Sequence, residues 1–178
     1  METLRSVRGV LRSHGVNNKP VWNTETNVGR TPAHTAVGGG TRGAAMVART
    51  YLLATENNVA RTFWYAADDR YWGGTWLETS GKQRLTTAGH AYAVVQKLLV
   101  GAHPRGCSVS GAHYTCRYRL ANGKSMLAVW STRGTFAYHG PRGTKQLAWA
   151  AGGGRSASHA TKVSVGAAPV YVIGTFKV

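Results

Sequence analysis

The sequence contains 178 residues, of which 22 are Lys or Arg and only six are Asp or Glu, so its formal net charge is +16. The basic residues recur singly along the chain, whereas a localisation tract or a nucleic-acid-binding arm would concentrate them. The charge therefore predicts non-specific attraction to polyanions but no dedicated nucleic-acid site. No stretch approaches the roughly 20 apolar residues of a membrane span, and the length suits one medium domain or two small ones.

The first residues predict an amphipathic helix. Leu4, Val7, Val10 and Leu11 recur at helical spacing, and Gly15 is placed to end the helix. Apolar residues alternate with Arg and Ser here, so the segment lacks the apolar core of a secretory signal peptide.

Residues 19–26 (KPVWNTET) predict a short buried strand that ends in polar residues around Glu25. In a chain with so few acids, a carboxylate at a strand end next to Trp22 suggests a catalytic or ligand-orienting group, because α/β folds place their sites at the carboxyl ends of parallel strands. The alternatives are a solvated loop Glu or a helix N-terminal Glu that follows Thr24.

A helix, a strand and another helix are predicted next. Residues 41–58 have apolar positions at helical spacing and an Asn-rich end. Residues 59–66 form a β-rich run that leads to the acidic pair Asp68-Asp69, and a Gly- and aromatic-rich loop then precedes a helix at about residues 86–100. Both predicted strands therefore end near carboxylates and tryptophans.

Residues 19–100 resemble the last two βα units of a retaining glycoside hydrolase of the large (β/α)8 superfamily that includes cellulases and β-xylosidases. In that family the seventh strand ends in a Trp-x-Thr-Glu-like motif whose Glu is the nucleophile, which here is Trp22-Asn23-Thr24-Glu25. The eighth strand ends in an aromatic residue that floors the sugar subsite, a role that the resemblance gives to Trp64. The resemblance further implies substrate-binding roles for Trp22, Asn23, Asp68, Asp69 and Trp72, with no cofactor and no metal.

The sequence departs from that family in two respects. Retaining chemistry needs two carboxyl groups about 5 Å apart, one to attack and one to protonate the leaving oxygen. The proton donor of the family follows Asn on the fourth strand, but only Glu2 precedes Glu25 in this chain, and no later acid follows an Asn. A complete barrel needs roughly 250 residues, so we expect the C-terminal part of a glycosidase, with the proton donor absent from this chain.

A Gly/Pro linker at residues 101–106 is expected to separate two domains. Beyond it the pattern is all-β, with strands expected at 114–120, 125–131, 135–139, 161–165 and 170–176, and Asn122-Gly123 is a strong hairpin signal. Members of the superfamily often carry a C-terminal β-sandwich that ends like Pro169-Val170-Tyr171-Val172. The predicted fold class is therefore α/β plus all-β: residues 1–100 as the last two βα units of a barrel, and residues 107–178 as a small antiparallel β-sandwich.

Two features of the expected sandwich have more than one interpretation. Trp130, Tyr138, Trp149 and Tyr171 are either a carbohydrate-stacking platform or core residues, and aromatic side chains in strands more often form core. Cys107 and Cys116 either form a disulfide, which fits an exported protein, or remain free thiols. Two cysteines are too few for a zinc site, and no His pair stands at ligand spacing.

Two functions follow from the sequence. The first is a glycosidase fragment that acts on a β-linked oligo- or polysaccharide through Glu25, and the second is a non-catalytic remnant or carbohydrate-binding β-sandwich module. Carbohydrate is the expected partner in both. The full-length parent enzyme is expected to be extracellular or in the cell envelope, with any signal upstream of this sequence.

Overall fold

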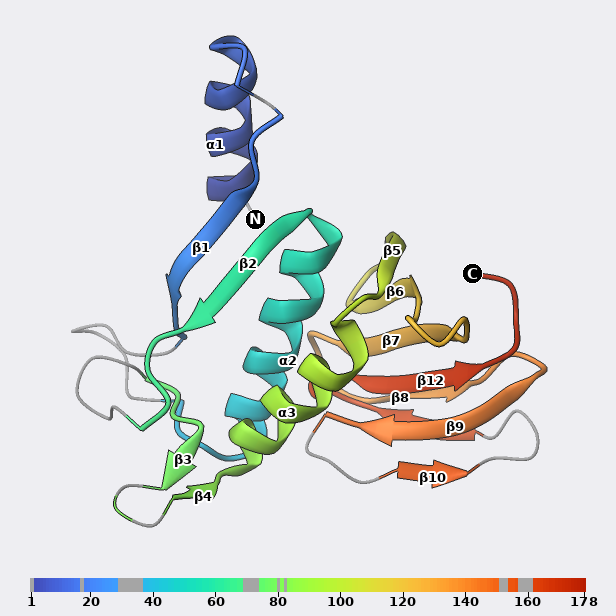
Figure 1. Ribbon diagram of the computed structural model, residues 1–178. Helices are drawn as coiled ribbons and strands as arrows, with labels where there is room; N and C mark the ends of the chain where they lie inside the picture. Colours follow the sequence, from blue (N-terminus) through green and yellow to red (C-terminus); the bar gives the residue numbers. More distant parts are fainter. Residues whose placement is uncertain are drawn as a thin grey trace.

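The computed structural model describes residues 2–16, 18–28, 37–68, 74–79, 81, 83–150, 154–156 and 162–178. Two parallel strands lie on one side of a helical layer, and the antiparallel sheets formed by residues 103–174 lie on the other side (Figure 1). The helices are α1 (Glu2–Ser13), α2 (Thr41–Glu56) and α3 (Thr87–Leu99). The strands are β1 (Val21–Thr26), β2 (Val59–Trp64), β3 (Glu78–Thr79), β4 (Arg84–Leu85), β5 (His103–Ser110), β6 (His113–Arg119), β7 (Ser125–Ser131), β8 (Phe136–His139), β9 (Thr144–Trp149), β10 (Gly154–Ser156), β11 (Lys162–Val165) and β12 (Val170–Gly174).

β1 and β2 form a parallel pair that is connected through α2. Val21 lies opposite Val59 and Thr26 lies opposite Trp64, with irregular register between these positions. Asn58 has a positive φ of 55°, which Asn tolerates better than most residues, and this conformation turns the chain from the end of α2 into β2. The parallel arrangement predicted by the strand–helix–strand order is confirmed.

α3 lies beside α2 and completes the helical layer (Figure 1). Thr86 caps its N-terminus, because the Thr86 hydroxyl accepts a hydrogen bond from the backbone N–H of Gly89 at 3.1 Å. Gly89 allows close packing: a Cβ atom at this position would lie 2.0 Å from the carbonyl oxygen of Leu77. The start of α3 is thereby held against the segment that follows the aromatic-rich loop.

α1 extends away from the rest of the molecule (Figure 1). Its Arg8 guanidinium donates hydrogen bonds to the backbone oxygens of Asn57 and Asn58, at 2.7 and 2.8 Å, and so ties α1 to the end of α2. None of the helices in the described part of the chain is long and apolar enough to cross a membrane.

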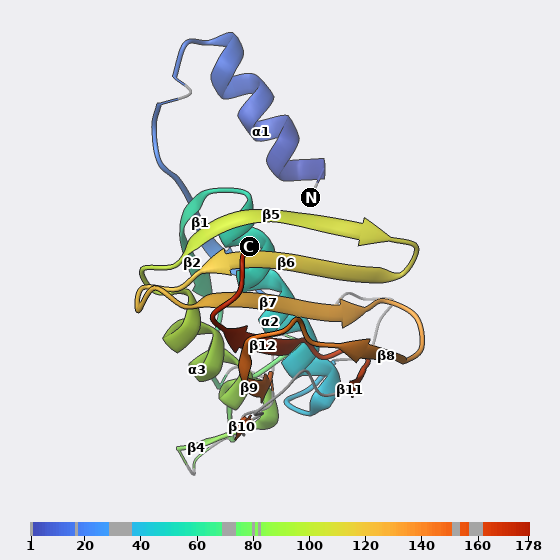
Figure 2. The same ribbon diagram turned by 90° about the vertical axis from the view of Figure 1, so that its right-hand side faces the viewer.

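The antiparallel region consists of a six-stranded sheet, in the order β10-β9-β12-β7-β6-β5, and a two-stranded sheet of β11 and β8 (Figure 2). β12 pairs with both β7 and β9, so it lies in the middle of the larger sheet. The hairpin predicted at Asn122-Gly123 connects β6 to β7, where Gly123 has a φ of +76°. The strands predicted from 114 to 139 and from 161 to 176 are confirmed within a few residues at each end.

Each face of the larger sheet covers an apolar core. One core lies between the sheet and the helical layer and includes Leu52, Tyr118, Met126, Trp130 and Tyr171. The other lies between the two sheets and is built mainly from Val and Leu side chains. Polar contacts join the helical layer to the sheets, as when the Tyr118 hydroxyl donates to the carbonyl oxygen of Leu52 at 2.9 Å. The Arg49 guanidinium likewise donates to the carbonyl oxygens of Ser131 and Ala167.

The linker expected at residues 101–106 is wrong in extent, because β5 already begins at His103. Gly101 has a φ of +71° and provides the turn out of α3. Pro104 is tolerated in β5 because β5 is the edge strand of the larger sheet, where a missing N–H need not break the ladder. β9 was not predicted, since Lys145 and Gln146 interrupt the apolar pattern of this strand.

Burial of tyrosine hydroxyls predicts a loss of stability at alkaline pH. Burial, with a smaller contribution from Tyr118, raises the pKa of Tyr171 above its usual value, and its hydroxyl has no hydrogen-bond partner in the described part of the chain. The unfolded state releases this proton near pH 10, whereas the folded state keeps it. The free energy of unfolding therefore has its full value below pH 10 and falls as the pH rises above 10. The loss for one such tyrosine reaches about 1.4 kcal/mol at pH 11.

Urea denaturation of the wild type and of Tyr171→Phe at pH 8 and pH 11 measures this contribution. The wild type is expected to lose about 1.4 kcal/mol more free energy of unfolding between these pH values than the variant. Deprotonation of lysines affects both proteins equally, so equal losses in the two proteins would contradict the prediction.

Candidate active site

The carboxyl ends of β1 and β2 lie side by side and carry the residues that the sequence motifs single out. Glu25 is the penultimate residue of β1, and Trp64 is the last residue of β2. Thr26 is the register partner of Trp64, and the backbone N–H of Tyr65 donates to the carbonyl oxygen of Thr26 at 2.9 Å, which extends the pairing beyond β2. Glu25 is exposed at this end of the strand pair.

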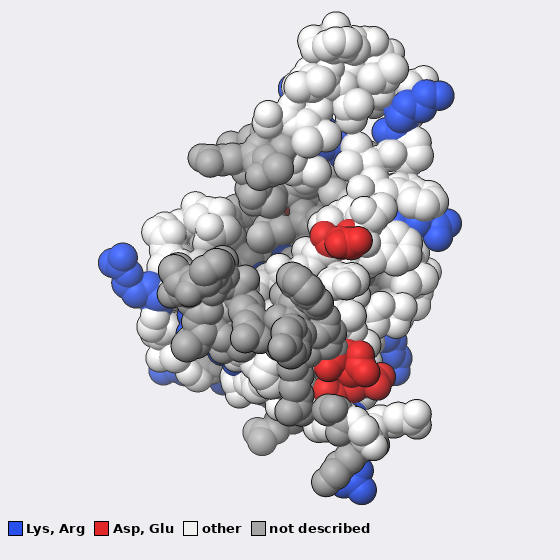
Figure 3. Space-filling model, turned by 90° about the vertical axis from the view of Figure 1, so that its left-hand side faces the viewer, with Lys and Arg blue, Asp and Glu red and all other residues white. Residues whose placement is uncertain are grey.

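The side of the β1–β2 pair away from α2 forms an open face with four large side chains: Trp22, Arg61, Phe63 and Tyr65. The rings of Trp22 and Phe63 lie 6.4 Å apart, and the Arg61 guanidinium carbon lies 4.9 Å from the centre of the Trp22 ring. Trp22, Phe63 and Tyr65 are 51%, 45% and 44% exposed. Figure 3 views the molecule from this side and shows acidic atoms among mostly uncharged ones, with most Lys and Arg toward the periphery.

Alternation along β1 places Glu25 on the open face. Thr26 shares the helix side with its register partner Trp64, and neighbouring strand residues point to opposite sides. The register shift between Asn23 and Thr26 adds one residue on β1, so both Trp22 and Glu25 reach the open face although three positions separate them. Glu25 therefore extends from a rigid strand onto a surface lined with aromatic side chains.

Trp64 does not lie on the open face, which differs from the subsite role expected for it. Its ring lies 6.4 Å from the ring of Tyr51 on α2, and its indole N–H donates to the carbonyl oxygen of Thr75 at 3.0 Å. The reason is strand alternation: Phe63 and Tyr65 take the open side, so Trp64 must face the helices. Tyr65 is the aromatic residue that follows β2 on the side of Glu25.

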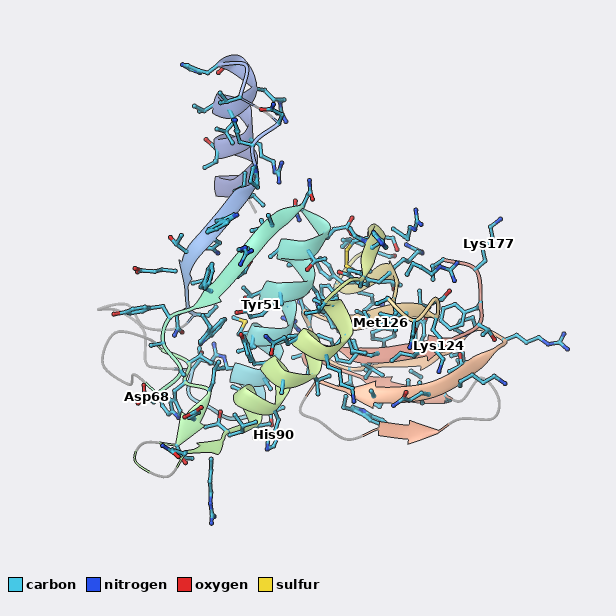
Figure 4. All side chains as sticks on the ribbon, in the orientation of Figure 1. Tyr51, Asp68, His90, Lys124, Met126 and Lys177 are labelled. Atoms are coloured by element: carbon cyan, nitrogen blue, oxygen red, sulfur yellow. A yellow bond between two sulfur atoms is a disulfide. The ribbon has the colours of Figure 1, made fainter. Side chains whose placement is uncertain are left out.

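The other expected substrate-binding residues fall in different places. Asn23 lines a cavity of about 490 Å³ between β1, α1 and α2, which Trp22 also borders. Asn23 is half-buried whereas its neighbour Trp22 is exposed, and strand alternation turns the Asn23 side chain away from the open face. Asp68 is exposed just beyond β2 (Figure 4). Asp69 and Trp72 lie outside the described residues.

Asn27 joins the segments that follow β1 and β2, and the motifs did not identify it. Its side-chain N–H groups donate to the carbonyl oxygens of Tyr65 and Thr75, at 2.5 and 3.0 Å. Its side-chain oxygen accepts from the backbone N–H groups of Val28 and Thr75, at 2.6 and 3.0 Å. The fully buried Thr75 hydroxyl in turn donates to the carbonyl oxygen of Val28 at 2.7 Å. We call these three residues, Asn27, Val28 and Thr75, the Asn27 clamp.

The Asn27 clamp fixes the position of Glu25 relative to Tyr65. Asn27 lies two residues after Glu25 and bonds directly to the Tyr65 backbone, so the ends of both strands are held by one side chain. The only signal in the sequence is an Asn just after a strand end, a type of residue that often bonds to nearby backbone. Its partner Thr75 lies 48 residues away in the sequence.

The remaining described carboxylates do not combine into a metal site. Glu56 ends α2 at the opposite end of β2, while Asp68 and Glu78 follow the carboxyl end of β2. No group of three or more His, Cys, Asp or Glu residues in the described ranges is arranged to hold a metal ion. An exposed carboxylate on an aromatic surface is suited to attack an electrophilic carbon that is bound against the rings.

The aromatic residues of the sheets are core residues rather than a sugar platform. Trp130 and Tyr171 are 1% and 0% exposed, and the Trp130 ring stacks on that of Tyr114 at 4.9 Å. Tyr138 and Trp149 are partly buried against the core between the sheets. Cys107 and Cys116 are register partners on β5 and β6 and are joined by a disulfide.

Comparison with known proteins gives one informative result. No family model and no curated protein matches the chain, but nine chains of solved structures do. One of them is a family 39 glycoside hydrolase from the gut symbiont Bacteroides cellulosilyticus WH2, with a TM-score of 0.65 and 20% sequence identity. The match covers 88% of this chain and 34% of that chain, so this chain spans about a third of the length of the hydrolase. The two proteins share a fold over this region.

Proposed function

We propose that this chain is the C-terminal part of a retaining β-glycosidase: the last two βα units of a (β/α)8 barrel with an attached β-sandwich. Glu25 is the nucleophile in this proposal, and the substrate is a β-linked glycan. The observation that carries the proposal is the exposed Glu25 at the carboxyl end of a parallel strand pair, on the side away from the helices. Barrel enzymes place their catalytic residues at this end of their strands.

The fold shared with a family 39 glycoside hydrolase supports the proposal. In a barrel the helices form the outer ring, so the open face of the β1–β2 pair would face the barrel interior. Trp22 and Phe63 would then be covered by neighbouring strands. Tyr65 takes the role of the aromatic residue at the sugar subsite, which the motif gave to Trp64. Trp64 becomes a positioning residue that holds the Thr75 backbone through its indole N–H.

The proposed step forms a bond between a Glu25 carboxylate oxygen and the anomeric carbon as the bond to the leaving oxygen breaks, and water later hydrolyses the glycosyl ester. The proton donor and the other strands must come from outside residues 1–178. The alternative, a carbohydrate-binding sandwich module, has less support because Trp130 and Tyr171 are buried.

A fluorinated glycoside with a dinitrophenolate leaving group tests the role of Glu25. Its leaving group departs without protonation, and the fluorine at C2 slows hydrolysis of the glycosyl ester, so the ester accumulates. Intact-protein mass spectrometry is expected to show one added fluoroglycosyl group, which peptide mapping places on Glu25. Glu78→Gln, which removes another described carboxylate, should label like the wild type, and Glu25→Gln should not label. Equal labelling of the wild type and Glu25→Gln would exclude Glu25 as the nucleophile.

A further inference from the structure

A second cavity lies far from Glu25, between the end of α3 and the β6–β7 hairpin. Its volume is about 410 Å³. Leu120, Ala148 and Ile173 are buried residues of the sheet that form its apolar floor. Lys97 on α3 and Lys124 on the hairpin stand at its rim and are exposed, together with Asn122 and Gln146. The views in Figures 2 and 4 agree that this hairpin lies next to the end of α3.

The hairpin that carries Lys124 is held in place by its own hydrogen bonds. Leu120 N–H donates to the carbonyl oxygen of Lys124 at 2.8 Å, and Gly123 N–H donates to that of Leu120 at 2.9 Å. The Asn122 side-chain oxygen accepts from the Lys124 N–H at 3.1 Å, so Asn122 offers its amide N–H groups to a ligand. The rim therefore presents donors: two ammonium groups and an amide.

None of the residues that line the cavity is acidic. All six Asp and Glu residues lie at or before Glu78 in the sequence, so α3 and every sandwich strand are free of acidic side chains. The sheet register also brings further cations to this end: Arg119 pairs with Ser125, which pairs with Gly174, which pairs with Thr144. Lys124 and Lys145 are adjacent in sequence to these positions, Arg142 precedes Thr144 by two residues, and Lys177 follows Gly174 by three. The local potential is therefore positive, which favours an anion.

We propose that this cavity, which we call the lysine cavity, binds an anionic sugar residue of a glycan, with Lys97 and Lys124 on its carboxylate or sulfate group. The volume lies in the range of small-molecule sites. The aliphatic floor suits the C–H face of a sugar ring. Nucleic acid fits less well, because single-stranded binding sites stack bases on aromatic side chains and no aromatic residue lines this cavity. The inference rests on the proposed function in taking a glycan as the ligand, and it narrows that glycan to an acidic one.

Calorimetric titration tests the lysine cavity with oligogalacturonates, sulfated cello-oligosaccharides and unmodified cello-oligosaccharides of the same length. The wild type is expected to bind at least one acidic oligosaccharide more tightly than the neutral one, and added salt should weaken that binding. The two acidic probes distinguish carboxylate from sulfate recognition. The double variant Lys97→Gln/Lys124→Gln is expected to bind the acidic probe roughly tenfold more weakly, since each exposed charge contributes modestly.

A matched double variant, Lys19→Gln/Lys162→Gln, removes the same formal charge from exposed lysines that do not line the cavity. It should keep wild-type affinity. Equal weakening in both double variants would show diffuse attraction to the charged surface and would overturn the proposal. Two other results would also overturn the proposal. One is equal affinity for the acidic and the neutral probes. The other is that Lys97 and Lys124 are needed for binding of duplex DNA but not for binding of the glycan probes.

Failure of this inference can be told apart from failure of the proposed function. Titration of Glu25→Gln with the acidic probe is expected to give wild-type affinity, because the lysine cavity lies at the other side of the helical layer. Binding without labelling of Glu25 would count against the glycosidase proposal alone. Labelling of Glu25 without selective binding of the acidic probes would count against the lysine cavity alone.

Discussion

The purified 178-residue chain is expected to show no Glu25-dependent hydrolysis of natural β-linked oligosaccharides at an enzyme-like rate. A sugar leaving group must be protonated as it departs, and general acid assistance contributes about 10²–10⁴-fold. No residue of the motif supplies that proton in this chain. Electrostatic preorganisation by the missing barrel walls is usually a larger contribution still.

The comparison between substrates isolates the missing acid. Aryl β-glycosides with good leaving groups need no protonation, so any residual Glu25-dependent rate should appear with these substrates first. We expect the ratio of aryl-glycoside to oligosaccharide turnover to exceed that of a complete retaining glycosidase by about 10²–10⁴. Turnover of the natural oligosaccharide that disappears in Glu25→Gln would contradict the prediction and would show that another described carboxylate, such as Asp68, acts as the acid.

Replacement of Asn27 with Ala is expected to lower the free energy of unfolding by about 2–4 kcal/mol. The substitution removes four hydrogen bonds of the Asn27 clamp and leaves backbone groups of Val28, Tyr65 and Thr75 without their partner. Each buried group left unsatisfied costs about 1–3 kcal/mol, and water that enters at the partly exposed end recovers some of that cost.

Asn23→Ala is the matched control for this substitution, because Asn23 belongs to β1 and is also partly buried. Urea denaturation should give a small change for Asn23→Ala and a large one for Asn27→Ala. Labelling of Glu25 by the fluorinated glycoside should also slow in Asn27→Ala, since Tyr65 and Glu25 lose their common support. Similar destabilisation by both substitutions would show that the clamp has no special role.

The sequence was sufficient to predict the order of the three helices and the two parallel strands, but not the side on which each side chain lies. Helical periodicity in residues 41–58 and β-rich runs around it define β1, α2 and β2, and such a connection forces neighbouring strands to run parallel. The irregular register between Asn23 and Thr26 is a property of the strand pair and has no local signature. It changes the alternation along β1, so a linear motif could not show that Asn23 and Trp64 face the helices.

The Asn27 clamp was hidden for a different reason. Its partners belong to segments that are distant in sequence, and a hydrogen bond between Asn27 and the backbone of Thr75 depends on how the intervening elements fold. The Asn122-Gly123 hairpin, in contrast, was predictable because its turn conformation depends on adjacent residues alone. Local chemistry could therefore be read from the sequence, whereas the contacts that organise the candidate site could not.

The two ends of the molecule protect their outer strands to different degrees. β5 closes one edge of the large sheet with Pro104, Arg105 and the irregular register before Cys107, and its disulfide to β6 prevents it from peeling away. Such features discourage strand addition by other chains. In the described residues, the β1–β2 pair has no comparable feature that protects its edges from strand addition, and its open face exposes Trp22, Phe63 and Tyr65. Self-association of this protein should therefore begin at the parallel strands and leave the sandwich folded, so the end that carries Glu25 is also the end that limits solubility.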